Sequence, residues 1–273
     1  MNFPPLFTFS QSSLQDYDDC ARRFQLRYLE RLTWPAIETE PTLENERRQQ
    51  AGQHFHRMAQ QALIGIPLEK LGKLANNPEL TQWWQNFSAA YPDIVHGAKL
   101  YPELTLSAPL GGHRLTAKFD LVAVLDEKAI IYDWKTYHKR SRNEFLAVRW
   151  QTRVYRWLLA ESGNQLNNGS PFPPEQIEMV YWFTEFPENP ARFSYDSGQF
   201  MRDRAGLEKI ITEISQSSEF PKIPEADTAK TCRFCAYRSY CARGSIAGDW
   251  REAEVETEAL PEIILEQIDE IEL

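Results

Sequence analysis

The chain has 273 residues, 25% of them charged, and a formal net charge of −9. It contains no run of eighteen apolar residues and its start lacks the basic and apolar segments of a secretory signal, so we expect neither a membrane span nor an exported protein. In a cytoplasmic protein the four cysteines should be reduced or metal-bound, not paired as disulfides.

The negative charge is concentrated at the carboxyl end. Residues 251–273 hold nine acidic residues and one basic one, whereas residues 1–250 hold 29 Lys and Arg against 30 Asp and Glu. A solvated acidic tail over 251–273 is the default expectation, and docking on a basic partner or mimicry of nucleic acid are the alternatives. Ile263, Ile264, Ile268 and Ile271 suggest a short amphipathic helix within it. Nucleic-acid binding needs a local cationic surface, not a basic whole. Charge therefore leaves a nucleic-acid partner open.

The first hundred residues read as helical. A helix is expected over 10–32, capped by Ser10 or Ser12 and carrying Cys20 in its interior, followed by a loop to Pro41. Further helices are expected over about 43–63, with His56 on it, and about 79–91. The aromatic residues of the last helix fit a core better than a base-stacking surface.

Strands dominate the middle of the chain. A strand with Glu103 is expected over 99–108, where Pro102 marks an edge or a bulge, and the apolar runs of 115–136 around Asp126-Glu127-Lys128 predict a β-hairpin. The remaining expected elements follow in order: an amphipathic helix over 143–162, an exposed loop over 164–174, strands over 177–184 and 191–195, a helix from Asp196 to about 217, and a cysteine-rich segment.

Charged residues stand inside the apolar strands of this hairpin. Asp120 lies in the first strand and Asp133 in the second, and Lys135 follows Asp133 by two residues, so both point to one face. Buried charges cost several kcal/mol each unless they are paired or bind a cation. The pattern favours a functional site over the alternative, a structural ion pair on an edge strand.

Together with His56 and Glu103, these residues form a donor set of carboxylates and one imidazole. Hard divalent ions such as Mg²⁺ or Mn²⁺ prefer such ligands, and Lys135 beside the ion could stabilise negative charge on a phosphate or a hydroxide. The set predicts hydrolysis of a phosphodiester. Asp126-Glu127-Lys128 has the same Asp-x-Lys spacing, but it lies in the polar connection and reads as a turn.

Two more groups of residues suggest a role. Gln151 and Tyr155, spaced i, i+4 on one helix face, could orient a catalytic group, although Tyr155 also fits a core position. The cysteines Cys232, Cys235 and Cys241, joined by Cys20, supply four thiolates for Zn²⁺ or a [4Fe–4S] cluster. Such a site would close a loop of about two hundred residues, which by analogy with cross-links contributes on the order of 5 kcal/mol.

With these residues assembled, the chain resembles the PD-(D/E)XK nuclease superfamily, specifically its RecB-like branch with an iron–sulfur cluster. It is similar to CRISPR-associated iron–sulfur exonucleases and helicase-associated nuclease domains. The resemblance spans Ser10 to Cys241 and rests on five motifs: the opening Ser10-Gln-Ser-Ser to Phe24 with its Cys20, Gly52-x-x-x-His56, Ala117-x-x-Asp120 with Ala for the usual Gly, Asp133-x-Lys135-Thr136, and Gln151-x-x-x-Tyr155. Ala21 stands where the family usually has Pro.

The resemblance implies a restriction-endonuclease-like α/β fold, with a central mixed sheet flanked by helices, a helical subdomain and a cysteine-rich cluster segment. Residues 1–250 would form one nuclease domain, with its helical part at about 36–97, its core at about 98–217 and its cluster segment at about 218–245 together with Cys20. By resemblance, His56, Asp120 and Asp133, with a contribution from Glu103, hold Mg²⁺ or Mn²⁺; Lys135, Gln151 and Tyr155 assist catalysis. The four cysteines would bind [4Fe–4S] in preference to Zn²⁺.

The function implied is a metal-dependent deoxyribonuclease, most simply an exonuclease, acting in DNA repair, recombination or CRISPR adaptation. Two alternatives stand beside it: a DNA-binding or scaffold subunit of a nuclease–helicase or integrase complex with unused nuclease residues, and a zinc-stabilised interaction module. The chain has no GxxxxGK[ST] motif. A helicase motor or an integrase would therefore be a separate partner protein.

Overall fold

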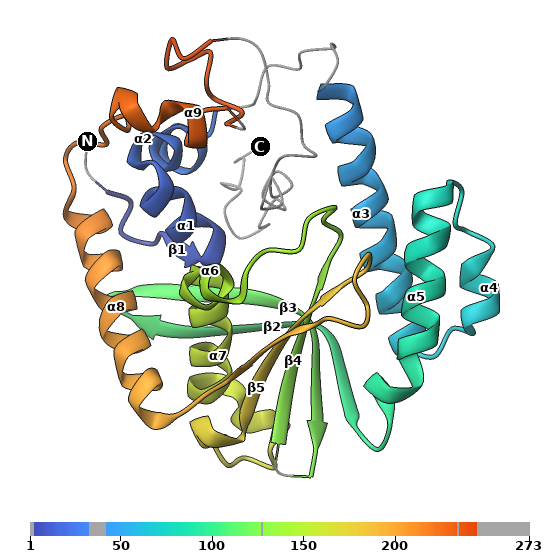
Figure 1. Cartoon of the computed structure of the whole chain (residues 1–273). Helices are drawn as coiled ribbons and strands as arrows, with labels where there is room; N and C mark the ends of the chain where they lie inside the picture. The colour runs from blue at the N-terminus through green and yellow to red at the C-terminus, as the bar shows by residue number, and fades with distance from the viewer. Residues whose placement is uncertain (1–2, 33–41, 127, 234, 245–273) are drawn as a thin grey trace, which may run out of the picture.

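The computed structural model describes residues 3–32, 42–126, 128–233 and 235–244. At its centre is a six-stranded mixed sheet (Figure 1). Two pairs of neighbouring strands run parallel, 8–10 with 113–125 and 128–135 with 177–183. The other neighbours are antiparallel. The strands are β1 (Thr8–Ser10), β2 (Lys99–Leu110), β3 (His113–Leu125), β4 (Lys128–Lys135), β5 (Ile177–Phe183) and β6 (Ala191–Ser194). The sheet order is β1-β3-β4-β5-β6, with β2 added on β3.

The predicted hairpin is confirmed as β3–β4. Its register places Leu125 opposite Lys128, and Asp126 in the connection has a φ of 52°, a left-handed conformation that Asp adopts more readily than most residues. Asp126 therefore belongs to the turn, as its polar surroundings predict, and Lys128 is the first residue of β4. Strand β2 pairs with β3 and contains Pro102, which agrees with an edge position.

Side-chain alternation reverses in the middle of the β2–β3 pair. On β3, the odd-numbered residues before Asp120 pack on one face of the sheet, namely Leu115, Ala117 and Phe119. The odd-numbered residues after it, Leu121 and Ala123, pack on the other face. The β2–β3 pairing skips Glu103 and Asp120, which lie between the pairs Pro102–Leu121 and Leu104–Phe119. Glu103 has a φ of 54°, which is uncommon for a residue with a side chain. The reversal changes the face of both strands at the position where the two carboxylates lie.

Helices cover both faces of the sheet (Figure 1), so the expected fold class is confirmed. One face carries α1 (Gln11–Asp19), α7 (Trp150–Ser162) and α8 (Ser197–Gln216), and the other carries α3 (Thr42–Leu63), α4 (Leu68–Gly72) and α5 (Pro78–Val95). On the second face, Phe55 of α3 and Trp83 and Phe87 of α5 are buried against Trp134 and Trp182 of the sheet. The aromatic residues of α5 are core residues, as expected.

The single helix predicted over 10–32 is wrong. The chain forms β1, then α1, then α2 (Ala21–Phe24) and a π-helical turn (Gln25–Leu29). Ser10 caps α1 by accepting a hydrogen bond from the Ser13 backbone, but Cys20 ends that helix with extended backbone, at φ −167° and ψ 106°. The break turns Cys20 out of the helical path, towards the carboxyl-terminal cysteines described below.

The helix predicted over 143–162 is likewise divided, into α6 (Asn143–Val148) and α7, by Arg149 with ψ 143°. The break brings the start of α7 against α1, where the Trp150 backbone N–H donates to Gln15 Oε1 at 3.3 Å and its indole N–H donates to Asp18 Oδ2 at 3.1 Å. These contacts satisfy donors at a helix start, which amphipathic periodicity alone does not reveal.

The other expected elements are found, with longer or additional segments. Helix α5 extends to Val95 through Pro92, Asp196 caps α8 by accepting from the Gln199 backbone at 2.6 Å, and α4 was not expected. Short elements follow: 3₁₀ turns at Gly163–Leu166, Pro174–Gln176 and Glu225–Asp227, and α9 (Thr228–Thr231). The loop expected from Trp34 to Pro41 and the acidic tail lie outside the described residues. Among the described helices, none is long and apolar enough to cross a bilayer.

Candidate active site

The end of the β3–β4 ladder positions the two aspartates. Backbone pairing between these strands ends at Leu121 and Tyr132, and Asp120 and Asp133 are the next residue on each strand. Beyond this point the Trp134 N–H donates to the Asp120 side chain, at 2.8 Å from Oδ2. A carboxylate thus takes the place of a strand partner, while β4 continues to pair with β5.

Asp120 meets the imidazole predicted from the helical region. His56 Nδ1, on α3, lies 3.2 Å from Asp120 Oδ1. Burial acts to raise the pKa of Asp120, but the charge and hydrogen bond of His56, the Trp134 N–H and the charge of Lys135 together hold that pKa below its usual value. The carboxylate is therefore ionised at neutral pH, as a metal ligand has to be.

A glycine brings α3 close enough for this contact. Gly52 lies one turn before His56, and a Cβ at this position would stand 3.1 Å from Thr136 Oγ1, at the end of β4. A larger residue would require the Thr136 side chain or the helix to shift by a few tenths of an ångström. This close approach gives a structural reason for the glycine in Gly52-x-x-x-His56.

Asp133 and Lys135 form an ion pair with little exposure. Lys135 Nζ lies 2.7 Å from Asp133 Oδ2, and their side chains are 7% and 4% exposed. Gln151 of α7 joins them, because its amide N–H donates to Asp133 Oδ1 at 2.7 Å and its oxygen accepts from Lys135 Nζ at 3.0 Å. The expected grouping of Asp133, Lys135 and Gln151 is thus present as one hydrogen-bonded unit.

Tyr155 supports this unit from one turn further along α7. Its hydroxyl donates to the Lys118 carbonyl at 2.7 Å and accepts from Gln151 Nε2 at 3.3 Å. Burial, followed by the charges of Asp133 and Asp120, raises the pKa of Tyr155 well above its usual value. The hydroxyl stays protonated at neutral pH, so it serves as a hydrogen-bond donor and not as a base.

Replacing Tyr155 by Phe removes the donor to the Lys118 carbonyl and should lower the free energy of unfolding by about 1–2 kcal/mol. Urea denaturation measures the change. Tyr240→Phe provides a matched control, since Tyr240 is 50% exposed and its hydroxyl should contribute little. Equal effects of the two substitutions would contradict the assigned role of Tyr155.

Glu103 is directed elsewhere. Although it and Asp120 fall at the same gap in the β2–β3 pairing, its side chain forms an ion pair with Lys118, whose Nζ lies 2.6 Å from Glu103 Oε2. The structure therefore brings His56 to Asp120 and Gln151 to Asp133 and Lys135, and places Glu103 beside them in contact with a lysine.

Sequence reasoning missed two aromatic neighbours of Lys135. Its Nζ lies 5.2 Å from the ring centre of Tyr181 and 5.6 Å from that of Tyr137, within the range of cation–π attraction. The Tyr181 hydroxyl also contacts Thr152 Oγ1 at 2.8 Å and lies 3.4 Å from Gln151 Oε1. Tyr181 lies in an apolar strand, where nothing in the local pattern separates it from a core residue.

The four cysteines lie around one pocket. Cys20 comes from the break between α1 and α2, and Cys232, Cys235 and Cys241 come from the carboxyl-terminal turns. Burial raises the pKa of the Cys235 thiol to about 11, although the nearby Arg23 acts to lower it. Four cationic side chains line the same pocket, namely Arg23, Lys222, Arg238 and Arg243. These positive charges act against the effect of burial on the thiols.

Arg23 is itself fixed by acidic residues of α1. Its side chain forms ion pairs of 2.7 Å with both Asp16 and Asp19, and Arg27 pairs with Asp16 at 2.9 Å. Burial acts to lower the pKa of Arg23 but the two aspartates raise it above its usual value. This network holds the segment on each side of Cys20 in place.

A search of curated proteins found no significant match. Two solved structures are similar to the chain. A protein from Eubacterium rectale, provisionally named an exonuclease, is 10% identical; the match covers 82% of this chain and 88% of that one, with a TM-score of 0.49. The protein SSO0001 is 14% identical; the match covers 87% of each chain, with a TM-score of 0.40. The family model of the PD-(D/E)XK nuclease superfamily matches residues 8–242 and so spans the sheet, the hairpin and the cysteine pocket. By that match, the chain belongs to the PD-(D/E)XK nuclease superfamily.

Proposed function

We propose that the protein is a divalent-metal-dependent nuclease that hydrolyses phosphodiester bonds in DNA. The observation that carries the proposal is that two groups stand at the adjacent ends of the β3–β4 pairing, Asp120 with His56 and Asp133 with Lys135 and Gln151. The donor set fits a hard divalent ion, since it offers two carboxylates and one imidazole on rigid elements.

In this proposal, His56, Asp120 and Asp133 hold Mg²⁺ or Mn²⁺. A bound ion of this kind supplies Lewis acidity and lowers the pKa of a coordinated water. Glu103, which pairs with Lys118, would contribute a further ligand or a contact to the ligands.

The chain's other residues act on the phosphate and on one another. Lys135 places a positive charge where negative charge develops on the phosphate oxygens. Gln151 holds Lys135 and Asp133 in fixed relation through its two hydrogen bonds, and Tyr155 holds Gln151. Prepositioning of this kind lowers the reorganisation needed during the reaction.

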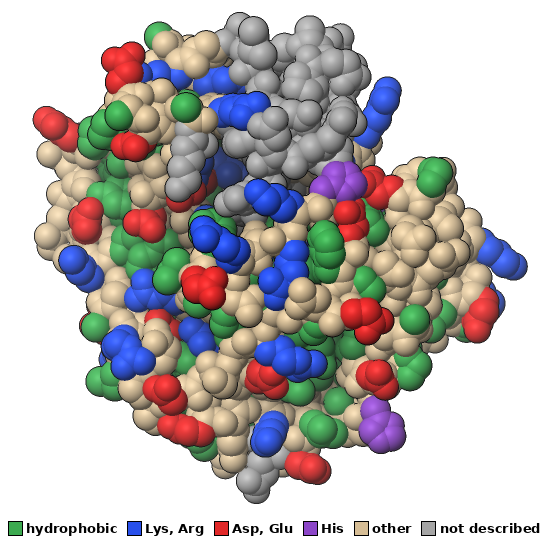
Figure 2. All heavy atoms as spheres, viewed as in Figure 1, with side chains coloured by type: hydrophobic (Ala, Val, Ile, Leu, Met, Phe, Trp, Pro, Cys, Tyr) green, Lys and Arg blue, Asp and Glu red, His purple; other side chains and the backbone are tan. Residues whose placement is uncertain are grey.

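DNA as the substrate is supported by the basic residues that follow Lys135 in the chain. Lys139 and Arg142 are exposed and Arg140 and Arg149 are half-buried. Figure 2 shows Lys and Arg side chains down the middle of the face on which α6 lies in Figure 1, with Asp and Glu side chains among them. A local positive surface of this kind offsets the negative charge of the chain as a whole when a phosphate backbone approaches.

We further propose that the four cysteines bind a [4Fe–4S] cluster with a structural role. Four thiols around one pocket and the cationic surroundings support a thiolate-bound metal centre. The resemblance to cluster-bearing nucleases favours iron–sulfur over Zn²⁺. Anaerobically purified protein should be brown with broad visible absorption; colourless protein with stoichiometric zinc would decide for the alternative.

The biological setting we propose is DNA repair, recombination or CRISPR adaptation, beside a separate helicase or integrase-type protein. Exonuclease action is the simplest form of the activity. The competing proposal is a DNA-binding subunit that makes no use of these residues, and the intact set of His56, Asp120, Asp133 and Lys135 argues against it.

Incubation with end-labelled DNA tests the activity. With Mg²⁺ or Mn²⁺ the protein should shorten single-stranded or duplex substrates, and excess EDTA should abolish cleavage because the proposed reaction needs the ion. Labels at the 5′ and 3′ ends, with blunt, overhanging and circular substrates, separate exonuclease from endonuclease action and give the polarity. DNA binding without cleavage under every metal condition would decide for the binding subunit.

A further inference from the structure

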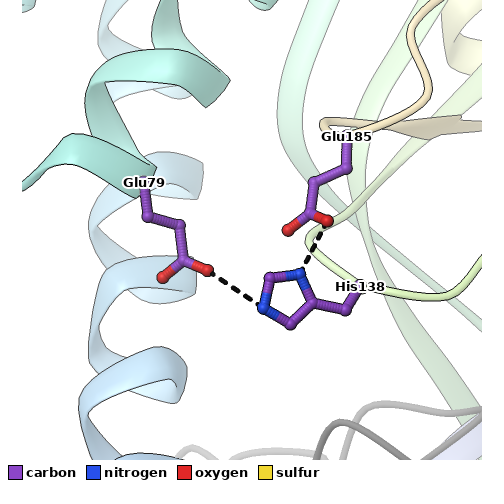
Figure 3. A group of neighbouring side chains, drawn as sticks. All are labelled: Glu79, His138 and Glu185. Atoms are coloured by element: carbon purple, nitrogen blue, oxygen red, sulfur yellow. Dashed lines mark hydrogen bonds and ion pairs between the residues drawn. The ribbon is translucent and has the colours of Figure 1, made fainter.

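A second group of side chains at the edge of the candidate site resembles a metal site. Glu79 from the first turn of α5, His138 from the segment after β4 and Glu185 from the segment after β5 bring three ligand atoms within 4.8 Å of one another. Figure 3 shows both carboxylates turned to the imidazole, with His138 Nδ1 2.7 Å from Glu185 Oε2 and Nε2 3.6 Å from Glu79 Oε1. Two carboxylates and an imidazole call for a cation.

The cation is present as a side chain. The guanidinium of Arg48, on α3, forms ion pairs with Glu79 and with Glu185, the latter at 2.8 Å, and one of its nitrogens lies 2.6 Å from His138 Nε2. It also lies over the ring of Trp83, at 5.1 Å, and its side chain is 11% exposed. A divalent ion and the Arg48 guanidinium carry charge of the same sign and would repel each other here.

Arg48 also reaches the strand that carries the candidate catalytic residues. It donates to the backbone carbonyl of Thr136, the residue after Lys135. Eight residues further along α3, about 12 Å in a regular helix, His56 meets Asp120. Between them, Gly52 approaches the Thr136 side chain. Two successive turns of α3 are thus held against the end of β4 before the helix reaches Asp120.

We propose that Arg48 is a positioning residue: it takes the place of a metal ion between Glu79, His138 and Glu185 and thereby fixes α3, with His56, against the ends of β4 and β5. The proposal rests on the proposed function for its effect on catalysis, but not for its effect on metal binding. Arginine suits the role because its planar group offers five N–H donors in fixed directions, whereas lysine offers a point charge.

The first test is metal binding by purified, cluster-loaded protein. Arg48→Ala should bind one more equivalent of Co²⁺ than the wild type, because the three ligand atoms lose their built-in cation. Adding His138→Ala to this variant should remove the extra equivalent. Calorimetric titration with Co²⁺ counts the sites, and this outcome does not depend on whether the protein cleaves DNA.

The second test is the metal requirement of cleavage. Displacing His56 should weaken the binding of the catalytic ion. Arg48→Ala should therefore need about tenfold more Mg²⁺ for half-maximal cleavage, which is the lower end of the effect seen when residues that orient metal ligands are replaced. DNA affinity measured without metal should change much less. Arg48→Lys should recover part of the loss, and Arg47→Ala, an exposed charge on the same helix, should leave the Mg²⁺ requirement unchanged.

The outcomes separate the two proposals. An Arg48→Ala variant with wild-type Co²⁺ stoichiometry and Mg²⁺ requirement overturns the positioning role. Should this variant fail to fold, Arg48→Lys decides, and a Mg²⁺ requirement equal to that of the wild type overturns the proposal. A wild-type protein without nuclease activity refutes the proposed function alone; the role of Arg48 in excluding metal then stands or falls with the Co²⁺ titration.

Discussion

Replacing Asp120 by Asn should lower the rate of metal-dependent DNA cleavage by on the order of 10³-fold, comparable to the loss of one strong stabilising group in an active site. Asn keeps an oxygen that can accept from the Trp134 N–H, so the end of the hairpin should be preserved. What is lost is the negative charge facing His56. Single-turnover cleavage of a labelled DNA measures the effect, with thermal unfolding to confirm that the variant is folded.

The same hairpin supplies the control. Asp126→Asn makes the identical change at the second Asp-x-Lys sequence, where Asp126 is exposed and has a left-handed φ that Asn also tolerates. This variant should cleave like the wild type. Comparable losses in both variants, or wild-type activity in Asp120→Asn, would refute the proposed site.

Lys135→Ala is a less specific test than the sequence suggests. Removing Lys135 leaves the carboxylate of Asp133 without its ion-pair partner in a position that is 4% exposed. Loss of one member of a buried pair destabilises by about 3–5 kcal/mol. The activity of the Lys135→Ala variant should therefore be compared with that of Lys128→Ala, and the stability of both variants should be measured.

Replacing Cys20 by Ser should abolish metal-centre binding and lower the unfolding temperature by about 10–20 °C. A cross-link that closes a loop of more than two hundred residues stabilises by about 5 kcal/mol. In a protein of this size each kcal/mol changes the unfolding temperature by a few degrees. The expected readouts are the visible spectrum, the iron content and calorimetric unfolding under anaerobic conditions.

Two comparisons make this result interpretable. Wild-type protein stripped of metal should unfold near the temperature of the Cys20→Ser variant, because both lose the same tie. Ser239→Ala, an exposed position between Cys235 and Cys241, should unfold like the loaded wild type. An unfolding temperature that Cys20→Ser leaves unchanged would show that the four thiols hold no stabilising centre.

The hairpin and its charged residues could be predicted from the sequence because the relevant signals are local. Apolar runs around a polar turn specify the strands, and Asp120 and Asp133 stand out where such runs should have none. The match of Gln151 with Tyr155 follows from helical spacing in the same way. In the structure Gln151 contacts both Asp133 and Tyr155.

The rest depends on contacts between segments far apart in the chain. Nothing near Cys20 indicates extended backbone, because the break serves thiols more than two hundred residues away. Arg149 interrupts a good amphipathic pattern so that Trp150 can reach α1. The ligand-like group around Arg48 combines side chains from four segments, and no short motif contains more than one of them.

The location of Cys20 has a consequence for how the protein is made. The other three cysteines of the pocket, Cys232 to Cys241, are synthesised more than two hundred residues later, so α1 and α2 must wait for that segment before their final contacts can form. Pairings of such long range are slow to form and leave surface exposed in the meantime. A growing chain of this protein should therefore stay sensitive to proteases around Cys20 until Cys241 has been synthesised, and the proposed metal centre would then join the two segments.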